Sequence, residues 1–185
     1  MNKIKLKFKS ISEIVGSPGL ALLVLTDEAE KRQISIVCDQ TAAHQLMLRT
    51  GNVGATQTLL PEALWQLLRM HTQLSFEILI NGLAGGQYKA IVYDTESLTP
   101  VSVGIVDAVM LSMMAPIPLY IEETLMYRQS VIFKEGSEGI AIPVNTLNKE
   151  MLEDALKKAI EHENYELASH LRDEMRRRHL DHPAK

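Results

Sequence analysis

Two periodicities divide this chain into a body and a tail. Residues 3–9 alternate lysine with an apolar residue, the period of two that predicts a strand with one buried and one solvated face. The lysines could meet phosphates, but alternating charge more commonly protects an edge strand from aggregation, and we favour that interpretation. In the tail, apolar residues recur from Leu152 to Ile160 at spacings of three and four, which predicts an amphipathic helix.

Further apolar runs, separated by turn signals, continue through the body. Strands are predicted at 20–26, 33–37, 76–81, 87–94, 98–103 and 119–121. Three main helices are predicted at 39–49, from Pro61 to about 71, and at 106–114, with Leu64, Leu67 and Leu68 of the second facing inward. Because strands and helices are interspersed without strict alternation, the predicted fold class is α+β with a mixed β-sheet.

The tail has the pattern of a compact antiparallel helical hairpin. A second apolar stripe begins at Leu167, with acidic residues near its start and arginines near its end, the order that the helix dipole favours. We therefore predict a body at 1–142, a linker at 143–147 and a hairpin at 148–180. Two short helices are marginal alone in water, so the hairpin should pack on something. The hairpin packs either on a protein partner or, as an ordinary C-terminal hairpin, on its own domain or on a symmetry-related copy.

Composition narrows the classes of function. The 185 residues are 46% hydrophobic and carry a net charge of −4, which argues mildly against a dedicated nucleic-acid binder. Cys38 is the one cysteine, so no intramolecular disulfide can form and a reducing environment is expected. The N-terminus lacks the apolar core of a signal peptide and no run is long enough to span a membrane, so we expect a cytoplasmic protein.

Carboxylates at helix starts are the first candidates for chemistry. Asp39 and Asp107 each begin a predicted helix that follows a strand, where a carboxylate can bind a metal ion beside the helix terminus. Glu122, which follows a buried strand, is the third candidate ligand. Simple helix capping explains both aspartates equally well and is the commoner role.

Two other features have both a structural and a functional interpretation. Cys38 precedes the helix at Asp39, whose N-terminus could lower the thiol pKa, although a buried apolar cysteine is far commoner. Met110, Met113 and Met114 could line a pocket for a small ligand, although methionines at helical spacing are more often part of a core.

The tail resembles a known interaction motif. The segments Tyr165-Glu-Leu-Ala168 and Leu171-Arg-Asp-Glu-Met175 are similar to the UVR motif, which is shared by subunits B and C of the bacterial excision-repair nuclease and by some protease adaptors. In that family the motif is an antiparallel helical hairpin that mediates protein–protein contact. The resemblance implies a protein partner, and we expect the contact to be made by Leu152, Leu156, Tyr165, Leu171 and Arg172.

The body resembles the bifunctional nuclease (BFN) domain family over roughly residues 1–130. The similarity rests on the order and spacing of Leu60-Pro-Glu-Ala-Leu-Trp-Gln-Leu-Leu68, Gly86-Gln-Tyr-Lys-Ala-Ile-Val92 and Asp107-Ala-Val-Met-Leu-Ser112. It implies a nuclease that hydrolyses RNA or DNA phosphodiester bonds. Because such enzymes hold Mg²⁺ or Mn²⁺ with clustered carboxylates, Asp39 and Asp107 are the predicted catalytic residues and, with Glu122, the predicted metal ligands.

The chain departs from the family pattern beside Asp107. The family commonly enters its third helix with Arg-x-Ser-Asp-Ala, and here Gly104 and Val106 stand in place of the arginine and the serine. If those residues carry phosphate contact or catalysis, the alternative is a catalytically inactive interaction or adaptor module, linked to DNA repair or to a stress protease. Both interpretations predict a homo-oligomer, because the spare apolar face of the hairpin and the sheet edges need cover.

Overall fold

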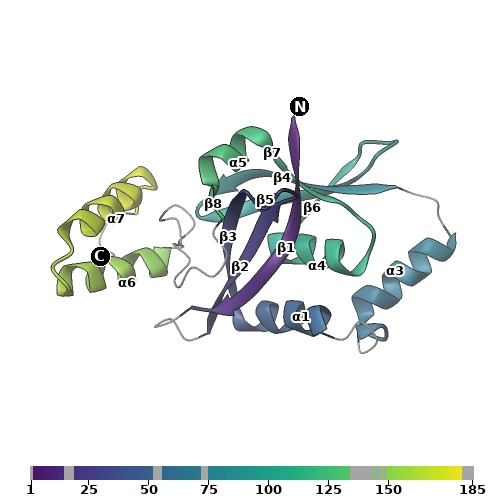
Figure 1. Ribbon diagram of the computed structural model, residues 1–185, viewed down its shortest axis with the longest axis horizontal. Coiled ribbons are helices and arrows are strands. Elements are labelled where there is room, and N and C mark those ends of the chain that lie inside the picture. Colours follow the sequence, from purple (N-terminus) through teal and green to yellow (C-terminus); the bar gives the residue numbers. More distant parts are fainter. Residues whose placement is uncertain are drawn as a thin grey trace. The chain divides into compact units, whose positions relative to one another are not determined.

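The computed structural model describes residues 2–14, 19–51, 56–71, 75–133, 144, 147 and 149–180 (Figure 1). The chain divides into two compact units, one of Met1–Gly82 with Tyr88–Gly136 and one of Leu83–Gln87 with Ser137–Lys185. The predicted linker at 143–147 lies largely outside the described residues, and the predicted domain bounds stay predictions.

A mixed β-sheet is the frame of the first unit. Its described strands are β1 Lys3–Glu13, β2 Leu20–Asp27, β3 Arg32–Asp39, β4 Phe76–Ala84, β5 Gln87–Asp94, β6 Pro100–Val103, β7 Leu119–Glu122 and β8 Val131–Ile132, in the order β6-β5-β4-β7-β1-β2-β3-β8. Strands β4 and β7 are parallel, whereas β1 pairs antiparallel with both β7 and β2. The sheet and its helices confirm the predicted α+β class.

Two helices lie together against the sheet. Helix α1 (Gln40–Gly51) contacts β1, β2 and β3, helix α4 (Ile105–Met114) contacts β7, and the two helices contact each other (Figure 1). Leu46 of α1 and Val109 of α4 are fully buried, as are strand residues such as Leu23 and Ile34. This shared burial places the core of the unit between the sheet and these helices.

Strand β1 lies inside the sheet, so the predicted edge strand is wrong. It has a hydrogen-bonded neighbour on each side, β7 and β2. Alternation along a strand shows which residues share a face, but it does not show how many strands flank it. Three of the four lysines of β1 are instead paired with carboxylates of neighbouring segments, in the ion pairs Lys3–Glu77, Lys5–Glu28 and Lys9–Glu30.

Helix α3 (Leu60–His71) has its apolar side outward, which contradicts the predicted orientation. Leu64 and Leu67 are 56% and 55% exposed, and Leu68 is 37% exposed. The opposite side of the helix is the anchored one: Glu62 is buried in an ion pair, and the Trp65 ring packs edge-on against Phe76. Amphipathic spacing reveals that two faces exist, but the contacts decide which of them faces the body.

The described part of the second unit contains a helical hairpin. Helix α6 (Lys149–Glu161) and helix α7 (Tyr165–Arg177) contact each other along their lengths, as the sequence predicted. Asn164 caps α7 by accepting a hydrogen bond from the backbone N–H of Leu167 at 3.1 Å. Glu163 in the turn has a φ of 55°, so the chain reverses through a left-handed residue.

Candidate functional site

Asp107 and Glu122 lie at the same edge of the sheet. Gly85 and Gly86 join β4 to β5 with φ values of 59° and 81°, the tight turn of an antiparallel hairpin. Because β6 is in turn antiparallel to β5, strands β4, β6 and β7 all run in one direction. Asp107 follows the end of β6 and Glu122 ends β7, so both follow carboxyl ends of parallel strands, where ligands commonly bind in such sheets.

Asp39 lies at the opposite edge of the sheet. Asp39 pairs with Leu20 of β2, and the neighbouring residue Ala21 pairs with Glu13, the last residue of β1. Glu122 instead pairs with Lys3, the first residue of β1. The length of β1 therefore separates the two carboxylates by on the order of 30 Å, at about 3.3 Å per residue. One metal ion cannot bind both, because metal–oxygen contacts are shorter than about 2.6 Å.

The two aspartates also differ in what they contact. The carboxylate of Asp39 accepts a hydrogen bond from the backbone N–H of Ala42 at 2.7 Å, so it caps α1. Asp107 is exposed in the first turn of α4, whose N-cap is Gly104 without a side-chain hydrogen bond. A Cβ atom at position 104 would lie 2.8 Å from an oxygen of Asp107, so glycine there leaves space for the carboxylate. Asp107 is thus the better placed of the pair to meet a ligand.

The predicted three-carboxylate metal centre does not form in this arrangement. Within the described ranges, no group of three or more His, Cys, Asp or Glu side chains could hold a metal ion. The sequence placed Asp39 and Asp107 together because each begins a helix after a strand. It could not show that β3 and β6 end at opposite edges, since that depends on the direction of every strand between them.

Cys38 has the inert character that buried cysteines usually have. Its side chain is 7% exposed, and burial, with a smaller effect of the Asp39 carboxylate, raises the thiol pKa to about 11. The thiolate is the nucleophilic form, so a thiol with this pKa is unreactive at neutral pH. The buried alternative offered by the sequence is therefore confirmed.

A pocket of about 370 Å³ lies between α3 and the ends of α1 and α4. Arg49 and Glu62 form a buried ion pair in its wall, with 2.7 Å between Nε and Oε1, and Arg49 also donates a hydrogen bond to the carbonyl of Gln45 at 2.8 Å. Met113 and Met114 line the same pocket, so these two methionines border a cavity rather than only filling a core. Sequence spacing alone did not indicate the ion pair, because its partners come from different helices.

An ionic cluster links β1 to β4 and β5. Glu77 accepts hydrogen bonds from the ammonium of Lys3 and from the hydroxyl of Tyr93, and these two contacts hold the pKa of its carboxyl below the ordinary value. The Lys3 ammonium lies 4.2 Å from the centre of the Tyr120 ring. The cluster joins strands that are distant in sequence, and it pairs the Lys3 ammonium with a carboxylate of the protein itself.

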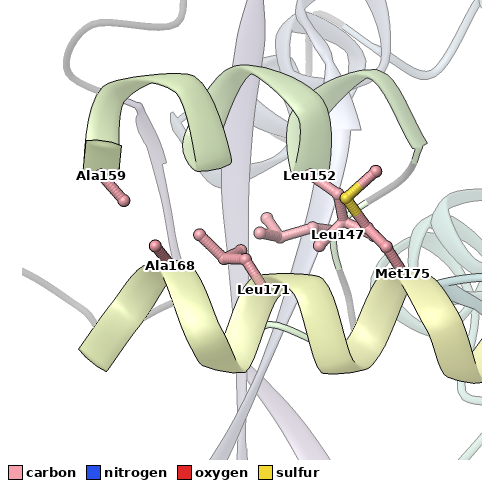
Figure 2. Close-up of a cluster of buried hydrophobic side chains, with 6 residues drawn as sticks. All are labelled: Leu147, Leu152, Ala159, Ala168, Leu171 and Met175. Atoms are coloured by element: carbon pink, nitrogen blue, oxygen red, sulfur yellow. The ribbon is translucent and has the colours of Figure 1, made fainter. Parts of the chain in front are cut away.

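The hairpin closes its own apolar interior. Figure 2 shows side chains of α6 and α7 pointing toward one another. The buried set is Leu147, Leu152, Ala159, Ala168, Leu171 and Met175. Leu152 and Leu171 are 0% and 1% exposed, so these two predicted partner-binding residues lie in the hairpin core and not on its surface. Leu156 is partly buried, and Tyr165 and Arg172 are exposed.

The exposed apolar residues of the hairpin gather where the two helices meet. Ile160 near the end of α6 is 44% exposed, and Tyr165 and Leu167 at the start of α7 are 69% and 40% exposed. We call these three residues the hairpin tip. The sequence assigned Ile160 and Leu167 to the inner stripe, because periodic spacing does not show which residues at the margin of a stripe stay exposed.

Hydrogen bonds and ion pairs hold together the end of the hairpin opposite the tip. Arg178 donates from Nε to the carboxylate of Glu174 at 2.6 Å and from Nη1 to the carbonyl of Leu147. Glu174 is buried and is also paired with Arg177. These contacts tie the end of α7 to the chain entering α6, so the hairpin is a defined unit rather than two loose helices.

Two protein families match parts of the chain. The bifunctional nuclease domain matches residues 23–134, and the UvrB/uvrC motif matches residues 145–177. The chain therefore belongs to the bifunctional nuclease domain family and carries a C-terminal UvrB/UvrC motif. No curated protein matches the chain. Among the described helices, none is long and apolar enough to cross a membrane.

Proposed function

We propose that this protein is a nuclease recruited through its tail. The hairpin binds a protein partner, and the body hydrolyses phosphodiester bonds of RNA or DNA in the cytoplasm. The observation that carries the recruitment is the hairpin itself, which buries most of its inner face yet leaves an apolar tip exposed to water. The observation that favours hydrolysis is membership of the bifunctional nuclease domain family.

The hairpin tip has the composition of a small binding anchor. Tyr165 offers a large amphipathic ring, the side-chain type enriched at the energetic centre of interfaces, and Ile160 and Leu167 flank it with apolar surface. Arg172 is exposed farther along α7 and could supply a charged contact at the rim. Because the hairpin core is already closed, docking at the tip needs no unfolding of the helices.

A crosslinking experiment on the full chain tests the docking. A photoreactive amino acid at position 165 should crosslink one defined protein in cells, whereas the same group at exposed Glu150, about three helical turns from Ile160 along α6, should not. The crosslinked protein is then purified and titrated with wild type and with Tyr165→Ala, which we expect to weaken binding by about tenfold or more, as for a hot-spot residue. Equal crosslinking from both positions, or equal affinity of both proteins, would refute docking at the tip.

In the body, the proposed hydrolysis rests on a single carboxylate. The exposed carboxylate of Asp107 stands at the start of α4, and a helix N-terminus favours the phosphate anion. Asp39 cannot share that site, because it caps α1 at the other edge of the sheet. We therefore propose Asp107 as the residue of the body on which activity depends, and assign no catalytic step to Asp39.

Nuclease activity is tested with labelled single-stranded RNA and DNA in Mg²⁺, in Mn²⁺ and in chelator. Wild type should cleave with a divalent ion, Asp107→Asn should lose most of the activity, and Asp39→Ser should keep it, since serine preserves a cap on α1. Equal loss in both variants would place the site elsewhere. If wild type cleaves neither substrate, the body is a scaffold and the protein is the adaptor that its departures at Gly104 and Val106 suggest.

A further inference from the structure

Helix α3 presents leucines to water on one side. Leu60, Leu64 and Leu67 are 70%, 56% and 55% exposed, and Met70 on the flank is 77% exposed. The spacing of four and then three residues puts the leucines within a narrow sector of the helix, at about 100° per residue. This is the spacing at which the seam of a helix packs against a second helix. We call Leu60, Leu64 and Leu67 the leucine seam.

The helix cannot bury this seam by turning toward its own body. Glu62 lies on the other side of α3 and is held by Arg49, with a second contact of 2.9 Å from Nη2 to Oε2. The Trp65 ring, also away from the seam, packs against Phe76 with ring centres 6.4 Å apart. A rotation of α3 that buried the leucines would break both anchors and expose a charged pair, so the seam stays outward.

We propose that the leucine seam is a dimer interface in which α3 of a second copy of this chain packs antiparallel against it. Charge favours this occupant. The Asp, Glu, Lys and Arg positions of α3 are Glu62 and Arg69, and both line the pocket on the opposite side. The seam therefore sets no like charges against each other when it meets its own copy. A two-fold axis is also the commonest symmetry of homo-oligomers.

The size of the surface fits the centre of such an interface. A helix of 12 residues offers a strip roughly 18 Å long and about 10 Å wide. A specific complex buries about 800 Å² on each partner, with an apolar centre and a polar rim. The seam supplies that centre, and exposed surface of the body beside α3 must supply the rest, so we expect a dimer that dissociates on dilution.

The antiparallel arrangement gives each leucine a definite partner. With the two-fold axis beside Leu64, Leu60 of one copy lies opposite Leu67 of the other. The Cα atoms at position 64 then face each other closely. Those at position 60 lie about 12 Å apart along the axis, since each is four residues, or about 6 Å, from the centre. A parallel pair would instead bring both positions together.

Disulfide trapping tests this arrangement in the full chain. Cys38 is buried, with a thiol pKa of about 11, so the wild type should not crosslink under mild oxidation. Leu64→Cys should form a covalent dimer, because its Cα atoms fall within the roughly 4.4–6.8 Å that a disulfide spans. Leu60→Cys and Leu98→Cys should not, the latter being an equally exposed leucine outside α3. Crosslinking at 60 as well as 64 would refute the antiparallel arrangement.

Charge substitution gives a second, independent readout. Light scattering across the micromolar range should show a dimer for the wild type and monomers for Leu64→Glu and for Leu64→Lys. An equimolar mixture of the two variants should recover the dimer, which requires that the two copies touch each other at this position. A wild type that stays monomeric, or a Leu64→Glu variant that stays dimeric, would overturn the proposal. Neither result bears on the nuclease and docking assays, which use other residues.

Discussion

The ion pair between Arg49 and Glu62 offers a sharp test of how α3 is held. The perturbation is Glu62→Leu, which removes the carboxylate but keeps an apolar side chain of similar length. Arg49 and Glu62 have side chains that are only 3% and 9% exposed, so the guanidinium left behind loses its partner in a largely dry site. A charge stranded in this way destabilises a protein far more than loss of a surface pair does.

The expected loss follows from the contacts. Glu62 accepts a hydrogen bond from Nη2 at 2.9 Å, and its other oxygen lies 2.7 Å from Nε in the ion pair without hydrogen-bond geometry. Without Glu62 one N–H group loses its acceptor and the guanidinium loses its counter-charge, while Nη1 keeps the Gln45 carbonyl. One buried unsatisfied donor costs about 1–3 kcal/mol. The stranded charge adds to this cost, and breaking a buried ion pair costs roughly 3–5 kcal/mol in all. Because the pair lines a pocket that water can enter, we expect the lower end, about 3 kcal/mol.

Trp65 allows the unfolding of α3 to be followed separately from that of the other helices. It is the one tryptophan of the chain and lies on α3 itself, so its fluorescence reports the helix, whereas far-ultraviolet circular dichroism reports every helix. In urea, Glu62→Leu should shift the fluorescence transition to lower denaturant. If α3 detaches before the rest of the body unfolds, this transition should also separate from the dichroism transition.

The double variant Arg49→Met with Glu62→Leu supplies the control. Replacing both partners by apolar residues removes the stranded charge, so most of the lost stability should return. The double-mutant cycle should then yield a coupling of about 2 kcal/mol or more. A loss below about 1 kcal/mol for Glu62→Leu, or a double variant no more stable than the single one, would refute the claim that this pair anchors α3.

Three further predictions concern other parts of the chain. Leu171→Ala should cost about 2–5 kcal/mol of hairpin stability, seen as lost hydrogen-exchange protection in α6 and α7, whereas exposed Leu167→Ala should change it by less than about 0.5 kcal/mol. The pKa of Cys38 is raised from 9.0 to about 11, so the stabilisation by its protonated thiol is complete below pH 9 and disappears as the pH rises to about 11. In Cys38→Ala the free energy of unfolding should therefore not show this fall between pH 9 and 11. Because the pKa of Glu77 is lowered from 4.5, its contribution is present above pH 4.5 and disappears as the pH falls through the lower folded value; Glu77→Gln should flatten the acid limb of a urea-unfolding series.

Most element positions could be predicted from local pattern. The helices at α1 and α4, the hairpin of β4 and β5, and the paired tail helices all lie where periodicity and turn residues indicated. Such features depend on neighbours within a few residues, for which the period of two or 3.6 is a direct geometric consequence. The exposed tip of the hairpin was beyond this approach, because Ile160 and Leu167 continue the apolar spacing of their helices.

The candidate site was predicted in part. Asp107 was recognised as a carboxylate at a helix start, and it lies exposed in the first turn of α4. Its supposed partner Asp39 lies across the sheet, and Glu62 was not recognised at all. Both errors concern residues whose neighbours are far away in sequence, and a linear pattern holds no information on which segments will meet.

The chain's local chemistry was enough to establish an α+β body, a helical hairpin and the family to which they belong, because these rest on short-range periodicity and on residue order. Strand order placed β1 inside the sheet and carried Asp39 away from Glu122. Helix α3 holds Glu62 against Arg49 on one side and leaves its leucines exposed on the other. These features arise from packing between segments that are distant in sequence, which short-range periodicity does not record.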